Sequence, residues 1–193
     1  MTEVKTPSRP RIEPVPAAER TGELRSLLDS LSPPSPPGQP PRPDRNLPCT
    51  IVKHADLFPY WAGLGRGLQS GTLPWRDREL ITLRVAFLSG SEYEWAHHSR
   101  SARRAGITDG EIGRIQLDVD AGGWDAATAA KIRTVEEFKR DHAISQPTWD
   151  VISADYSEQQ LIELLLLQGF YWMTAGILKS LRIEVDPWLT EQS

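Results

Sequence analysis

Proline is concentrated at one end of this 193-residue chain, and this concentration limits where regular structure can begin. Twelve of the 16 prolines lie at or before Pro48, and eight of them fall within residues 32–48. Each proline fixes its own φ angle and lacks an amide donor, so this density excludes a helix or a central strand. We therefore expect an extended linker at residues 32–48, which ends an N-terminal arm (residues 1–46) and leads into one domain at residues 47–193.

The arm contains one predicted element, a short helix at residues 17–31. Leu24, Leu27, Leu28 and Leu31 are three or four residues apart, which places them on one face of a helix. Such a face needs an apolar surface to pack against. The linker after it is interpreted as a tether, and the alternative is a ligand for a domain with an aromatic groove.

The rest of the sequence has helical periodicity, without sustained alternation of period two or hairpin turns. Glycines, prolines and capping residues divide it into expected helices at residues 47–67, 75–89, 91–105, 108–117, 124–142, 148–156 and 157–181. About seven helices with short connections predict a compact all-α bundle. The most apolar stretch, residues 164–178, is shorter than a membrane span requires and predicts a buried helix.

Composition and charge exclude several classes of function. The chain has 22 basic and 26 acidic residues, a formal net charge of −4 and no basic run, so nucleic acid is not an expected partner. Cys49 is the single cysteine, which excludes an intrachain disulfide, a dithiol redox pair and a multi-cysteine metal site. Residues 1–11 lack the apolar core of a secretory signal. We expect a cytoplasmic protein without a membrane partner.

The densest cluster of reactive side chains is Ser-Glu-Tyr-Glu-Trp-Ala-His-His at residues 91–98. Glu94 and His98 are four residues apart, so on a helix they project from one face and can share a proton or a substrate atom. Tyr93 and His97 form a second such pair, about 100° away around the helix. We expect the face of Glu94 and His98 to point inward; an ordinary surface ion pair is the competing interpretation.

Two charged residues interrupt the apolar helix expected just before this cluster. Glu79 and Arg84 lie in residues 75–89, where nearly every face is apolar, so the helix should be buried. A buried charge needs a partner or a ligand. Arg84 is therefore either one half of a buried ion pair or a group that binds a substrate carboxylate.

These residues resemble the carboxymuconolactone decarboxylase family, which also contains the AhpD-like alkylhydroperoxidases. The resemblance covers roughly residues 46–187 and is strongest at residues 78–80, Arg-Glu-Leu, and at residues 90–98. It implies the AhpD-like helical fold and a homo-oligomer, commonly a trimer or a hexamer.

The peroxidase branch of this family carries the motif Cys-x-x-Cys-x-x-x-His, with a glutamate twelve residues before the first cysteine. Here Ser91 and Glu94 stand at the two cysteine positions, His98 at the histidine and Glu79 at the glutamate. A thiol peroxidase cycle needs a nucleophilic and a resolving thiol, and this frame has neither. The motif looks instead like the decarboxylase branch, in which acid and base side chains act on carbon acids without a metal or an organic cofactor.

The expected function is therefore that of a cofactor-independent lyase or isomerase, which moves protons in a small carbonyl-conjugated acid or lactone. Glu79, Glu94 and His98 are the expected catalytic residues, with His98 carrying the proton and Glu79 orienting its ring. The expected substrate-binding residues are Arg84, Ser91 and Tyr93, and no metal ligand is expected. Two alternatives are a thiol-independent or residual alkylhydroperoxidase-like oxidoreductase and a non-catalytic oligomeric scaffold.

Overall fold

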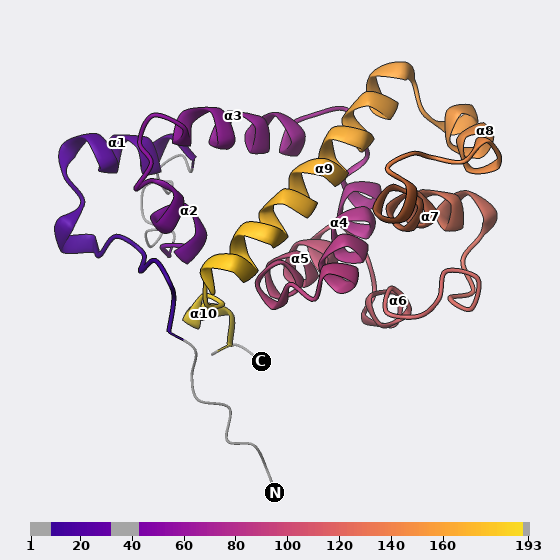
Figure 1. The fold of residues 1–193 in the computed structure, drawn as a ribbon. Helices are drawn as coiled ribbons and strands as arrows, with labels where there is room; N and C mark the ends of the chain where they lie inside the picture. Colours follow the sequence, from indigo (N-terminus) through magenta and orange to yellow (C-terminus); the bar gives the residue numbers. More distant parts are fainter. Residues whose placement is uncertain (1–8, 32–42, 191–193) are drawn as a thin grey trace, which may run out of the picture. The chain divides into compact units, whose positions relative to one another are not determined.

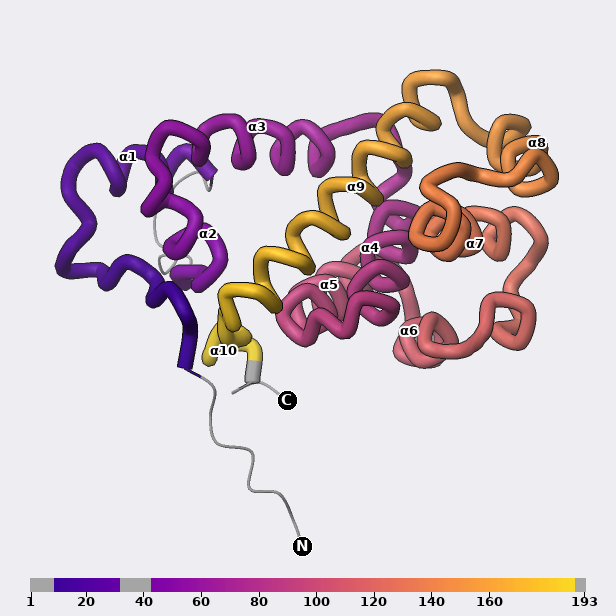
Figure 2. The backbone as a smooth tube through the Cα atoms, in the orientation of Figure 1, coloured from indigo at the N-terminus to yellow at the C-terminus, as the bar shows by residue number. Residues whose placement is uncertain are grey.

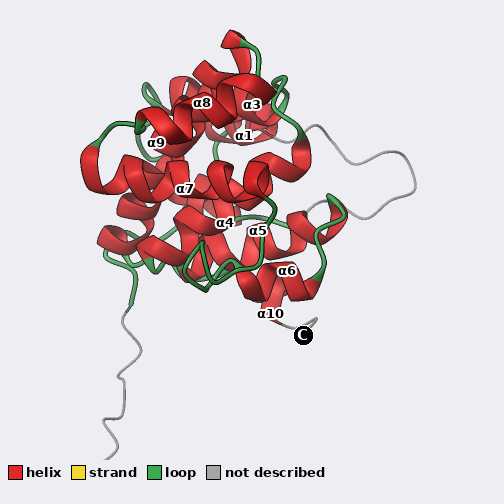
Figure 3. Ribbon diagram, turned by 90° about the vertical axis from the view of Figure 1, so that its right-hand side faces the viewer, coloured by secondary structure: helices red, strands yellow, loops and turns green. Residues whose placement is uncertain are grey.

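The computed structural model describes residues 9–31 and 43–190, and these residues form helices joined by loops, with no strand among them (Figures 1 and 3). The α-helices are α1 (Gly22–Leu31), α2 (Asn46–Ile51), α3 (Phe58–Gln69), α4 (Trp75–Ser89), α5 (Glu92–Arg104), α6 (Asp109–Arg114), α7 (Ala126–Asp141), α8 (Gln146–Asp155), α9 (Glu158–Leu181) and α10 (Pro187–Thr190). A 3₁₀ turn, Ala17–Glu19, precedes α1. The all-α prediction is confirmed.

The chain forms two compact units. The first lies within residues 1–67 and 177–193, and the second comprises residues 68–176. Figure 2 follows the backbone through both, from α1 to α10. The predicted boundary between an arm and a domain at residue 46 lies inside the first unit, and it stays a prediction. Every candidate site residue named from the sequence belongs to the second unit.

The first unit contains the apolar face predicted for the arm. Val15, Val52, Phe58 and Ala62 form its buried cluster, and the amide of Val15 donates to the carbonyl of Cys49 at 2.9 Å. The predicted leucine face of α1 packs against this cluster through Leu24, Leu27, Leu28 and Leu31. The helix of the arm therefore covers apolar side chains of residues 52–62, as the spacing of its leucines requires.

The second unit is built around α4. All residues from Glu79 to Ala86 are buried, and α4 packs against both α5 and α7. Leu80 and Leu83 of α4 meet Ala102 of α5 in one apolar cluster. The same cluster also includes Ile107, Ile112, Ile115, Val119 and Ile132. This packing confirms that the helix at residues 75–89 is buried on nearly all sides, and it places α4 and α5 side by side.

The helix expected at residues 47–67 is divided in the structure into α2 and α3. Pro59 is the second residue of α3, where its missing amide costs nothing, and it disfavours helical geometry in the residue before it. Phe58 nevertheless begins α3, and the break lies at residues 52–57, which form turns, so the prediction of one helix over residues 47–67 is wrong. Pro48 likewise lies in the first turn of α2, so the extended segment ends before Asn46, whereas residues 32–42 of the predicted linker lie outside the described residues.

The last long helix, α9, follows the prediction closely. It begins after Ser157, which caps it by accepting a hydrogen bond from the amide of Gln160. Among the described helices it alone is long and apolar enough to cross a membrane, but 56% of its most apolar window is buried inside the protein. Helices of protein cores pass the same test of length and composition, so this is weak evidence for a span.

Candidate functional site

A tight turn brings α5 back along α4. Gly90 ends α4 with φ at 64°, in the left-handed region that glycine adopts without strain, and its amide donates to the carbonyl of Phe87. Ser91 then begins α5: its hydroxyl accepts from the amide of Glu94 at 3.4 Å. The two helices that carry the candidate residues are thereby held against each other.

Glu79 of α4 and His98 of α5 form a direct pair. The Nδ1 of His98 lies 2.7 Å from the Oε2 of Glu79, and the two side chains are 17% and 6% exposed. The second oxygen of Glu79 accepts two more hydrogen bonds, from the Ser101 hydroxyl at 2.9 Å and from the Trp75 indole at 3.1 Å. Three donors thus surround one carboxylate.

The surroundings of Glu79 keep it ionised. Burial alone would raise the pKa of this carboxyl, but the charge of His98 and the hydrogen bonds from His98, Ser101 and Trp75 lower it overall. An ionised carboxylate can only accept, so Nδ1 of His98 carries the proton of this bond. The Nε2 atom of the ring is then left to exchange a proton with a substrate.

Glu94 has the opposite surroundings. Its residue is 3% exposed, and neither carboxylate oxygen has a hydrogen-bond partner among the described residues. Burial raises the pKa of Glu94 to about 7, and the charge of His98 offsets only part of that rise. Near neutral pH this carboxyl is therefore able both to give and to take a proton.

Ser91 and Tyr93, two of the predicted substrate-binding residues, occupy different positions. Ser91 is 2% exposed and serves as the N-cap of α5. Tyr93 is 6% exposed, and its ring stacks on that of His97 with the centroids 4.5 Å apart. The structure thus buries Tyr93 as well as Glu94 and leaves both histidines partly exposed. The substrate-binding roles of Ser91 and Tyr93 remain predictions.

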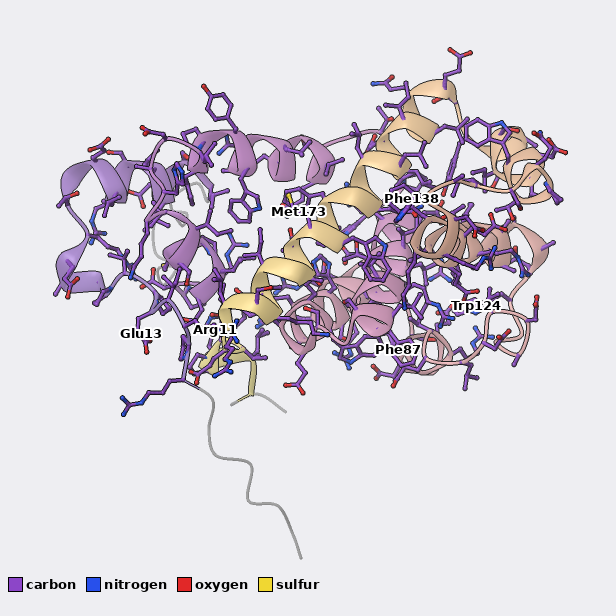
Figure 4. The ribbon with its side chains drawn as sticks, viewed as in Figure 1. Arg11, Glu13, Phe87, Trp124, Phe138 and Met173 are labelled. Atoms are coloured by element: carbon purple, nitrogen blue, oxygen red, sulfur yellow. The ribbon has the colours of Figure 1, made fainter. Side chains whose placement is uncertain are left out.

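Arg84 is not brought together with the other candidate residues. Its guanidinium donates to the carbonyls of Ile115 and Leu117, the second at 2.7 Å, and forms an ion pair with Glu136 of α7. The side chain is 5% exposed, and Phe87 lies against it with the ring centroid 5.5 Å away (Figure 4 labels Phe87). These contacts correspond to the buried ion pair that the sequence left open, rather than to a group that binds a substrate carboxylate.

Tyr171 of α9 also lies at the site. Its ring meets the ring of His98 edge to face, at 4.9 Å between centroids and an interplanar angle of 88°. Burial and the charges of Glu79 and Glu94 raise the pKa of its hydroxyl far above the ordinary value. Tyr171 therefore stays protonated and is able to donate a hydrogen bond beside both carboxyl groups.

Three residues of this arrangement have no place in the catalytic or binding set predicted from the sequence. Trp75 precedes Glu79 by four residues and Ser101 follows His98 by three, so helical spacing alone puts each on the face of its partner. That signal was available before the structure. The direction of Tyr171 could not be predicted from the sequence, because α9 is apolar on most of its faces and its rotation is set by packing.

Cys49 is buried, and the described residues contain no evident metal site. Cys49 is 4% exposed, and burial raises the pKa of its thiol above the ordinary value. Within residues 9–31 and 43–190, no group of three or more histidine, cysteine, aspartate and glutamate side chains is arranged to hold a metal ion. Glu79, His98 and Glu94 thus supply an ionised carboxylate, an imidazole bonded to it and a carboxyl group that can exchange a proton near neutral pH.

Comparisons with known proteins find a family segment in this chain. Residues 55–136 match the model of the carboxymuconolactone decarboxylase family. This segment contains Glu79, Glu94 and His98. A search of curated protein sequences finds no significant match. The family resemblance read from the motif is thereby confirmed.

Solved structures with the same fold come from several proteins. The debrominase Bmp8 in complex with 2,3,4-tribromopyrrole has a TM-score of 0.73 at 14% identity, over 96% of this chain and 97% of that one. An uncharacterized peroxidase-related protein from Ralstonia eutropha JMP134, described as an alkylhydroperoxidase AhpD core, has a TM-score of 0.73 at 11% identity, over 94% and 96%. A peroxidase-related protein from Silicibacter sp. TM1040 gives 0.70 at 14%, over 98% and 97%. Identities this low show the AhpD-like fold and nothing finer.

Proposed function

We propose that this chain, which carries a carboxymuconolactone decarboxylase family segment at residues 55–136, is an enzyme that moves protons next to a carbonyl group without an organic cofactor. One observation supports the proposal above the others. Two carboxyl groups, Glu79 and Glu94, flank one histidine, and their pKa values are displaced in opposite directions. Such a displacement supports the roles of an orienting carboxylate for Glu79 and an exchangeable acid for Glu94.

The substrate class follows from what these groups can do. A small acid whose carboxylate sits on the carbon next to a carbonyl loses carbon dioxide when the bond between the carboxylate and that carbon breaks. The electron pair moves into the carbonyl and forms an enolate, which then needs a proton on carbon. Protonated Glu94 or the imidazolium of His98 delivers that proton, and water restores it. Tyr171 donates to the enolate oxygen.

An isomerase would use the same groups in another order. His98 would remove a proton from carbon through Nε2, with Nδ1 held on Glu79, and Glu94 would return a proton to a different carbon of the same enolate. No atom leaves in that case. The two reactions differ in the release of carbon dioxide, so a single assay separates them.

The test is a panel of β-keto acids and carboxylactones incubated with the purified chain in D₂O. Carbon dioxide is measured by a coupled assay, and deuterium in the product by NMR. We expect turnover of at least one compound, with deuterium at the carbon next to the carbonyl, and a loss of roughly 10³-fold or more for His98→Gln. The matched control is His54→Gln, an exposed histidine of the first unit.

Two outcomes would count against the proposal. One is full activity in His98→Gln, which would move the chemistry to another part of the molecule. The other is the absence of both turnover and deuterium exchange across the panel, while the chain remains folded by circular dichroism. The second outcome would favour the scaffold alternative.

We also propose that the substrate is a small molecule and that the chain assembles with itself in the cytoplasm, as the family resemblance implies. Light scattering coupled to size exclusion measures the mass of the assembly. A trimer or a hexamer would agree with the proposal, and a stable monomer that is fully active would contradict it.

A further inference from the structure

The carboxylate of Glu79 is held from two helices at once. Trp75 donates to it from α4, one turn before Glu79, and Ser101 donates from α5, one turn after His98. Both bonds end on Oε1, whereas His98 uses Oε2. The two donors therefore fill one oxygen and leave the other for the histidine alone.

This division fixes the rotation of the carboxylate. A carboxyl group turns easily about its terminal bond, because torsions of this kind have broad energy wells. Two donors on Oε1, at 3.1 Å and 2.9 Å, favour a single orientation in which Oε2 faces Nδ1 of His98. Hydrogen bonds to a charged acceptor are stronger than those between neutral groups, so the loss of either donor should weaken the orientation of Glu79 toward His98.

We propose that Ser101 and Trp75 are positioning residues, which act through Glu79 to hold His98 in the tautomer with its proton on Nδ1. The catalytic meaning of this inference rests on the proposed function, because Nε2 of His98 must be unprotonated to take a proton from a substrate. The tautomer itself is a property of the resting protein. It can be measured whether or not a substrate is known.

Trp75 connects the buried carboxylate of Glu79 with the protein surface. Its residue is 45% exposed, although its indole nitrogen reaches the buried carboxylate. A molecule that contacts the exposed edge of this ring would also touch a donor to Glu79. Ser101 carries no comparable exposed surface, so the two residues hold the same oxygen in different settings.

The experiment reads the four histidines of the chain by ¹⁵N NMR, with His98 assigned through its own substitution. Spectra are recorded at increasing pH until the ¹⁵N shifts of the histidine rings no longer change. We expect the parent protein to show His98 with Nδ1 protonated. Ser101→Ala and Trp75→Phe should each populate both tautomers, and Ser101→Thr, which keeps a hydroxyl, should restore the parent spectrum.

Ser99→Ala is the matched control. Ser99 lies two residues before Ser101 on α5, is 7% exposed, and its hydroxyl has no hydrogen-bond partner within the described part of the chain. It should leave the tautomer of His98 unchanged. If Ser101→Ala and Trp75→Phe also leave it unchanged while circular dichroism shows a native helix content, the inference is wrong. A parent protein with its proton on Nε2 would overturn it as well.

Kinetics separate this inference from the proposed function. With a substrate from the panel, Ser101→Ala should lower kcat by roughly tenfold and leave KM nearly unchanged, since the serine contacts Glu79 and not the substrate. A shifted tautomer in a chain that turns over no compound would support the positioning role and reject the enzyme. An unshifted tautomer in an active enzyme would support the enzyme and reject the positioning role.

Discussion

His98 is bonded to the carboxylate of the neighbouring helix and not to the one on its own helix. Its Nδ1 lies 2.7 Å from Oε2 of Glu79, whereas neither oxygen of Glu94, one turn earlier on α5, has a hydrogen-bond partner among the residues described. On folding, three hydrogen-bond donors replace the water around Glu79. For Glu94, no donor among the described residues replaces the water that burial removes. The pKa of Glu79 is lowered and that of Glu94 is raised, so the two carboxyl groups should change the pH dependence of stability in opposite directions.

Glu94→Gln should change how stability depends on pH. The pKa of Glu94 is raised from 4.5 to about 7, so the folded protein holds this proton where the unfolded chain releases it. The free energy of unfolding therefore falls as the pH rises from about 4.5 to about 7. At about 1.4 kcal/mol per pKa unit, the fall attributable to Glu94 is on the order of 3 kcal/mol.

Urea titrations across this pH range check the prediction. Relative to the parent, Glu94→Gln should gain stability as the pH rises. It should also lose, at every pH, the proposed isomerase activity, in which Glu94 returns the proton. Glu92→Gln is the control, because Glu92 is exposed on the same first turn of α5. Parallel stability curves for the parent and Glu94→Gln would show that this carboxyl does not hold a proton in the folded state.

Arg84→Met should cost stability and leave substrate binding unchanged. The guanidinium holds the carbonyls of Ile115 and Leu117 and pairs with Glu136, so its removal leaves buried acceptors without a donor. Methionine keeps most of the aliphatic stem. We expect a loss of roughly 3 kcal/mol in the free energy of unfolding, with KM of the folded enzyme within about twofold of the parent.

Arg103→Met controls for the loss of a positive charge on the same unit. Arg103 pairs with Asp109 at 2.7 Å, but the two side chains are 55% and 77% exposed, and exposed pairs contribute little. Urea titration should show almost no change for this variant. A large rise in KM for Arg84→Met, without loss of stability, would restore Arg84 as a group that binds the substrate.

Helices with strong end signals could be predicted from the sequence. The helix at residues 75–89 matches α4 at both ends because Pro74 precedes it and Gly90 closes it. Thr108 and Glu111, which are three residues apart as in the sequence pattern of a capping box, form one at the start of α6. Pro59 gave an equally clear signal, and the prediction of one helix over residues 47–67 overlooked it.

The candidate site was only partly predictable. Glu79 was predicted to be buried because it lies within an apolar helix, and Glu94 because the face it shares with His98 was expected to point inward; both residues are buried. Which carboxylate accepts the hydrogen bond from His98 depends on the distance between α4 and α5, and the sequence of either helix alone does not determine that distance. The partners of Arg84 come from the end of α6 and from α7, more than 30 residues away in sequence, so no local pattern indicates them.

Cys49→Ala should leave the proposed activity toward carbonyl acids unchanged. The thiol is 4% exposed and its pKa is raised by burial, so little thiolate forms at neutral pH. The parent protein should also fail to reduce an alkyl hydroperoxide at the expense of a dithiol, because no second cysteine can resolve an oxidised Cys49. Consumption of peroxide that disappears in Cys49→Ala would instead establish a thiol peroxidase.

Gly71→Ala should destabilise the second unit by forcing Glu163 out of its position. A Cβ atom at residue 71 would lie 2.1 Å from Oε1 of Glu163, far inside any contact that real structures tolerate. The carboxylate cannot swing away cheaply, because its Oε2 accepts from the amides of Thr72 and Leu73 at 2.7 Å and 3.1 Å. We expect a loss of roughly 1–3 kcal/mol in the free energy of unfolding.

A double-mutant cycle tests the cause of that loss. In a Glu163→Ala background the clash is absent, so Gly71→Ala should cost far less than it does in the parent. Gly113→Ala is the control, since nothing lies within 4 Å of the Cβ it would add on α6 and alanine favours a helix over glycine. Equal costs of Gly71→Ala in both backgrounds would show that the backbone at residue 71, and not Glu163, requires the glycine.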